Sequence, residues 1–88
     1  MYIYEGMTKQ VGSICSLVES RYNIDLTQYH NNPDHVYSIF EHYSDRVNLL
    51  RIKDIDSSEY TKAFLIYEAA RMLLREIAPR RIKKRKKK

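Results

Sequence analysis

The C-terminal segment contains the residues whose chemistry is easiest to predict. The last nine residues of this 88-residue chain hold eight of its sixteen Lys and Arg side chains. Closely spaced cations bind nucleic acid without recognising its base sequence, because they neutralise phosphates and release the counterions condensed around them. We therefore predict a phosphate-binding segment made of Arg80, Arg81, Lys83, Lys84, Arg85, Lys86, Lys87 and Lys88.

The remainder of the chain is mildly acidic. Residues 1–79 hold eight Lys and Arg against all eleven Asp and Glu, a formal charge of −3, whereas residues 80–88 carry +8. The net charge of +5 therefore does not describe a protein that is basic over its whole surface. This segregation of charge indicates a polyanionic partner or a localisation signal.

Residues 80–88 are also compatible with roles other than nucleic-acid binding. The run from Lys83 to Lys88 resembles a monopartite nuclear localisation signal of eukaryotic cells or their viruses. A polybasic segment can also contact an anionic membrane surface or an acidic protein, or only keep the chain soluble. We expect nucleic acid, either DNA or RNA, and the composition leaves the alternatives open.

Two arginines ahead of this segment could extend the site. Arg71 and Arg75 lie one helical turn apart and could continue the positive charge onto a rigid surface. Arg71 is also well placed to form an ion pair with Glu68 at i+3, and Arg75 to pair with Glu68 or Glu76. We expect Arg71 to form the ion pair with Glu68.

The aromatic composition is unusual, with eight tyrosines and no tryptophan. Aromatic rings can stack on unpaired bases. Four tyrosines fall on or beside apolar helical stripes, where we expect core positions with the hydroxyl at the edge: Tyr22, Tyr43, Tyr60 and Tyr67. The pattern gives no clear core position to the other four tyrosines, which are Tyr2, Tyr4, Tyr29 and Tyr37. Tyr37, on the polar flank of a predicted helix, is the one to test.

No arrangement typical of an enzyme is present. His35 and His42 are seven residues apart, whereas a helical zinc pair needs i, i+4 spacing. Cys15 lies on an apolar stripe without a neighbouring base, which predicts a buried structural thiol. Gly6 and Gly12 are the only glycines, too few for a phosphate-binding loop. We expect no enzymatic activity, metal or cofactor.

A single cysteine favours a reducing compartment, because secreted domains of this size are usually held together by several disulfides. The chain has no apolar run of about 18 residues that could span a membrane, and residues 1–7 do not resemble a signal peptide. We expect an intracellular protein. It would be cytoplasmic, or nuclear if it comes from a eukaryote or a eukaryotic virus.

The elements that must position these residues are predicted to be helices, since only two glycines and two prolines interrupt the chain. A helix over about 8–22 begins at Thr8 and ends at Asn23, and Gly12 within it costs about 1 kcal/mol relative to Ala. A short turn over 25–30 is predicted from the capping-box spacing that starts at Asp25. A helix over about 33–51 is predicted from Asn32 as cap and Pro33 as first residue.

The third predicted helix, over about 57–77, begins with a capping box at Asp56 and ends before Pro79. It is apolar around most of its circumference, and we expect two other helices to leave part of it uncovered. We therefore predict a homodimer or a protein partner that contacts Leu65, Ala69, Met72 and Leu73.

The resulting fold class is all-α, with a compact three-helix domain over 1–79 and a disordered basic tail over 80–88. Our first hypothesis is a small non-enzymatic nucleic-acid-binding protein, accessory or viral, in which the tail contacts phosphates without recognising base sequence and the helical body self-associates. The alternative is an adaptor or subunit of a larger complex that docks through helix 57–77 and uses the tail for localisation or electrostatic steering.

Overall fold

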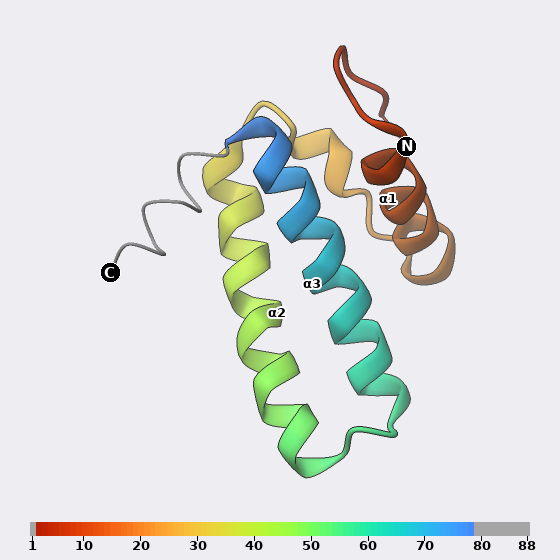
Figure 1. The fold of residues 1–88 in the computed structure, drawn as a ribbon, viewed down its shortest axis with the longest axis vertical. Helices are drawn as coiled ribbons and strands as arrows, with labels where there is room; N and C mark the ends of the chain where they lie inside the picture. Colours follow the sequence, from red (N-terminus) through yellow and green to blue (C-terminus); the bar gives the residue numbers. More distant parts are fainter. Residues whose placement is uncertain (1, 79–88) are drawn as a thin grey trace.

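The computed structural model describes residues 2–78. It contains three α-helices and one short 3₁₀ helix, and no strand occurs within this range. In chain order these are α1 (Lys9–Tyr22), η1 (Leu26–Tyr29), α2 (Pro33–Lys53) and α3 (Ser58–Ile77), as Figure 1 shows. The all-α prediction is confirmed, and each predicted helix boundary lies within two residues of the observed one. The predicted disordered tail, residues 80–88, lies outside the described residues.

Side chains cap the first two long helices as their sequences predict. The Thr8 hydroxyl accepts a hydrogen bond from the Val11 N–H at 3.3 Å, and the Asn32 side chain accepts one from the His35 N–H at 3.3 Å. Asn23 ends α1 in the left-handed conformation, with φ of 59°. Such caps satisfy backbone groups that the first and last turns of a helix leave without partners.

The two predicted capping boxes are wrong in detail. The N-cap of α3 is Ser57 and not Asp56, because the Ser57 hydroxyl accepts the Tyr60 N–H at 3.0 Å. Asp25 stands at the start of η1 but makes no side-chain capping bond there. Its carboxylate instead accepts the hydroxyl of the buried Thr27 at 2.8 Å, a local contact that competes with capping.

The helices form a flat arrangement with α3 in the middle. In Figure 1, α2 runs antiparallel to α3 on one side, and α1 lies on the other side of α3. The Cα atoms of α1 and α2 stay more than 8 Å apart, whereas η1 approaches all three long helices. The molecule measures 39 × 35 × 19 Å. The turn that joins α2 to α3 extends away from α1, so that end of the hairpin is covered by neither α1 nor η1.

The core forms where all the helices meet on α3. Its completely buried members include Val18 of α1, Leu26 of η1 and Val36 of α2. From α3 come Ile66, Ala69, Ala70, Leu73 and Leu74. The small side chains of Ala69 and Ala70 allow the neighbouring helices to approach closely. The expectation that two helices could not cover α3 is therefore wrong for most of its apolar surface.

Candidate nucleic-acid interface

Two of the predicted phosphate-binding residues lie within the described part of the chain. Arg71 and Arg75 follow one another on the outer side of α3, close to its C-terminal end. Arg71 donates to the Glu68 carboxylate at 2.7 Å, so the predicted i+3 pair is present. Arg75 is exposed. The other eight predicted phosphate ligands, residues 80–88 without Ile82, lie outside the described residues.

Glu76 does not serve Arg75 as an ion-pair partner. Its carboxylate accepts hydrogen bonds from the Tyr4 hydroxyl and from the Thr8 N–H, the latter at 3.2 Å. Burial and the nearby Glu76 carboxylate raise the pKa of the Tyr4 hydroxyl. These bonds hold the segment before α1 against the end of α3. Sequence analysis missed them because about 70 residues separate the partners.

The N-terminal segment is also attached to η1. The Tyr2 N–H donates to the Thr27 hydroxyl oxygen at 3.0 Å. The His30 ring stacks on both Tyr2 and Tyr4, with centroid distances of 4.7 and 5.0 Å. Tyr4 therefore packs against the core, a position that its sequence context did not predict.

An unpredicted row of aromatic rings crosses from α3 to α2. Its five members lie in the order Tyr60, Phe64, Tyr67, Phe40 and Tyr37, with successive centroid distances of 6.0, 6.3, 5.4 and 5.9 Å. These separations are typical of favourable ring pairs. Phe64 is 38% exposed, and the other four rings are half-buried.

The row changes how several tyrosines are interpreted. Tyr22 and Tyr43 pack against the buried core, as expected for residues on apolar stripes. Tyr60 and Tyr67 belong to the row at the edge of the molecule. Tyr37 was expected on a polar flank but packs against the core beside Phe40.

The four predicted interface residues separate into two pairs. Ala69 and Leu73 are completely buried inside the single chain, so they have no surface to offer a partner in this conformation. Leu65 and Met72 are half-buried and keep some exposed surface. Met72 lines an open groove of about 520 Å³ between α1 and α3, where it faces Ile14 and Leu17.

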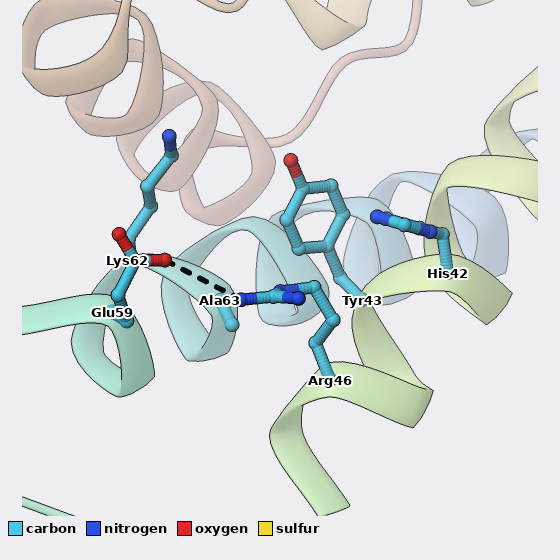
Figure 2. A pocket seen from close by; sticks show the side chains of 6 residues that line it. All are labelled: His42, Tyr43, Arg46, Glu59, Lys62 and Ala63. Carbon is cyan, nitrogen blue, oxygen red and sulfur yellow. Dashed lines mark hydrogen bonds and ion pairs between the residues drawn. The ribbon is translucent and has the colours of Figure 1, made fainter. Parts of the chain in front are cut away.

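A second hollow lies between α2 and α3, on the side toward the end of α1. It has a volume of about 230 Å³ and is lined by His42, Tyr43, Arg46, Glu59, Lys62 and Ala63, as Figure 2 shows. Arg46 and Glu59 form an ion pair at 3.5 Å across it, the dashed line in the figure. The Arg46 side chain is 41% exposed and that of Glu59 is 64% exposed, so water screens the pair and it contributes little to stability. The lining contains no Ser or Cys that a base could activate.

The Cys15 thiol is not activated as a nucleophile. Burial, with a smaller contribution from the Asp25 and Glu76 carboxylates, raises the pKa of the Cys15 thiol to about 12. Such a thiol stays protonated at neutral pH and is a poor nucleophile. Among the described residues, no three His, Cys, Asp or Glu side chains lie where they could hold a metal ion together.

Within residues 2–78, no helix has the length and apolar character needed to cross a membrane. Comparison of the chain with known proteins finds no family model, no curated protein and no solved structure that matches it.

Proposed function

We propose that this protein is a small non-enzymatic nucleic-acid-binding protein that contacts phosphates without recognising base sequence. The observation that carries the proposal is the segregation of charge, −3 over residues 1–79 and +8 over residues 80–88. A segment with eight cations neutralises several phosphates at once, and the release of counterions from the nucleic acid then favours binding. The helical domain would present this segment and add Arg75, which is exposed just ahead of it.

The proposal includes an intracellular, reducing location, because the only cysteine is buried and unpaired with another cysteine. It also includes self-association. Two copies would bring two basic segments to one polyanion and raise affinity through effective concentration.

Salt dependence tests the proposal directly. If residues 80–88 neutralise about six to eight phosphates, log affinity for duplex DNA against log salt should have a slope of about −5 to −7. Fluorescence anisotropy at salt concentrations from about 50 to about 200 mM would measure it. A variant with Lys83, Lys84, Arg85, Lys86, Lys87 and Lys88 changed to Gln should bind far more weakly and with a flatter slope.

The matched control changes cations elsewhere. Arg51 and Lys53 are exposed at the far end of α2, and Arg51→Gln with Lys53→Gln should leave both affinity and slope nearly unchanged. The proposal is wrong if the variant at 83–88 keeps the wild-type slope, since binding would then depend on other residues.

A second candidate function, that of an adaptor, is favoured by the apolar end of the α2–α3 hairpin. Ile52 is 84% exposed there, and Leu49 and Ile55 are each 51% exposed. Clustered exposed apolar side chains often mark sites of protein association. The half-buried Leu65 and Met72 of α3 could contribute to docking as well. Sedimentation velocity would test whether the chain associates through this end of the hairpin. If the wild type is a dimer and Ile52→Lys is a folded monomer, the apolar end is an association surface, as the adaptor function requires.

A further inference from the structure

We propose that the exposed strip of α3 binds single-stranded nucleic acid, with an unpaired base stacked on Phe64 and phosphates against Arg71 and Arg75. This inference rests on the proposed nucleic-acid binding and names the class of nucleic acid that is preferred. Two features carry it: a supported and exposed ring, and cations on the same strip.

The Phe64 ring is exposed and held in place at the same time. It keeps 38% of its surface exposed although it lies between two other rings of α3. Tyr60 stacks beside it at 6.0 Å with planes 24° apart, and Tyr67 lies at 6.3 Å and 42°. Tyr67 in turn stacks on Phe40 of α2 at 5.4 Å. A ring fixed in this way loses little conformational freedom when a base stacks on it.

The cations lie on the same side of α3 as this ring. Phe64, Arg71 and Arg75 are separated by seven and four residues, spacings that place side chains on one strip of a helix. At 1.5 Å per residue, the strip from Phe64 to Arg75 is about 16 Å long. A single strand can place one base and more than one phosphate over that distance.

A carboxylate limits phosphate binding at one of the two cations. Glu68 stands on the strip and holds Arg71 at 2.7 Å, so a phosphate must compete with it for that guanidinium. Arg75 is exposed, and the adjacent Glu76 is hydrogen-bonded to Tyr4 and Thr8, so Arg75 is the more accessible cation.

Base stacking on Phe64 requires an unpaired base. Bases in a duplex are stacked on one another, and taking one out costs a few kcal/mol, which base-flipping enzymes offset by contacts in a pocket. A ring on the surface of a helix offers no such pocket. Phe64 should therefore contribute to binding of single strands and not of duplexes, whereas the cations should contribute to both.

The test compares an oligothymidylate of about 20 nucleotides with the same strand paired to oligoadenylate, using the full chain. Phe64→Ala should weaken binding to the single strand by about fivefold to about a hundredfold and leave duplex affinity unchanged. Phe64→Leu, which keeps an apolar side chain but removes the ring, should give a similar loss. Ile3→Ala is the matched control and should change neither affinity, because Ile3 is a 74% exposed apolar residue that lies before α1 and outside the strip.

A spectroscopic readout is available because the chain has no tryptophan. Phe64→Trp introduces the only one, should keep single-strand affinity, and should lose fluorescence when the oligothymidylate binds but not when the duplex binds. Glu68→Gln should strengthen binding to both, since it releases Arg71. Circular dichroism would establish that each variant is folded.

Several outcomes would overturn the inference. A stacking role would be excluded if Phe64→Ala and Phe64→Leu lowered the affinity for single strand and duplex equally, or lowered neither. The charge-based proposal would still stand in that case if the variant at 83–88 lost binding. A wild-type dimer that becomes a monomer on Phe64→Ala would assign the strip to a second copy of the chain. Failure of the wild-type protein to bind either nucleic acid would refute the proposed function together with the inference.

Discussion

Leu73→Ala should destabilise the folded chain strongly and leave its assembly state unchanged. Leu73 is completely buried in the core and lies one residue from Met72, which keeps some exposed surface. The substitution removes buried carbon atoms worth about 2 kcal/mol in transfer free energy at roughly 0.8 kcal/mol per methylene. The cavity left behind adds to this, so the total loss should be about 3 to 4 kcal/mol, within the range for buried leucines.

That loss is large for a domain of this size, whose free energy of unfolding should be about 4 to 13 kcal/mol. Urea denaturation followed by circular dichroism would measure it as a lower midpoint at an unchanged slope. Leu49→Ala is the matched control. Leu49 is 51% exposed at the far end of α2, and its truncation should change the free energy of unfolding by no more than about 0.5 kcal/mol.

The competing interpretation, in which Leu73 belongs to an interface between chains, predicts the opposite pattern. Leu73→Ala would then weaken self-association in sedimentation experiments and make stability depend on protein concentration. A variant that retains wild-type stability as a monomer would refute the assignment of Leu73 to the core.

Three further predictions concern the first helix and its attachment to α3. Gly12→Ala should raise the free energy of unfolding by about 0.5 to 1 kcal/mol, a gain of several degrees in thermal midpoint, because a Cβ at Gly12 would meet only the Met7 sulfur at an ordinary 3.5 Å. A loss would mean that α1 cannot accept the extra atom. Tyr4→Phe should cost about 1.5 to 3 kcal/mol in the same denaturation assay, since it removes a hydrogen bond to a carboxylate, and no change would show that this bond contributes nothing. The pKa of Cys15, raised to about 12 in the folded chain, makes the thiol's contribution to stability complete below its unfolded pKa of about 8.5 and progressively lost as pH rises toward 12. Cys15→Ala should therefore flatten the pH dependence of stability above about pH 8.5, and an unchanged profile would contradict the shift.

The helices were predictable because their signals are local. Asn32 and Pro33 mark the start of α2 by their own side chains, and Asn23 marks the end of α1 by its tolerance of a positive φ. The ion pair of Arg71 with Glu68 was predictable for the same reason, since i+3 neighbours on a helix meet whatever surrounds them. Such features depend on a few adjacent residues and not on tertiary structure.

The features that sequence analysis missed depend on how the helices pack. The bond from Tyr4 to Glu76 joins residues 72 positions apart. The contact between Phe40 and Tyr67 exists only because α2 and α3 pack in one particular register. The core positions of Ala69 and Leu73 were misjudged because helix count alone does not reveal that η1 also packs on α3. Nothing in the pattern of apolar residues distinguishes these arrangements from others.

The division of roles around α3 also explains why its strip could bind a ligand without harming the fold. One side of the helix supplies six completely buried residues, and the opposite side carries Phe64, Arg71 and Arg75. Substitutions on the exposed strip should therefore change binding more than stability, whereas substitutions on the buried side should do the reverse. Phe64 should affect both binding and stability. Its ring contacts Tyr60 and Tyr67, so its removal should also lower the free energy of unfolding, by about 0.5 to 1.5 kcal/mol for each of the two ring pairs lost. Comparing Phe64→Ala with Phe64→Leu and Phe64→Trp separates this packing contribution from stacking on a base.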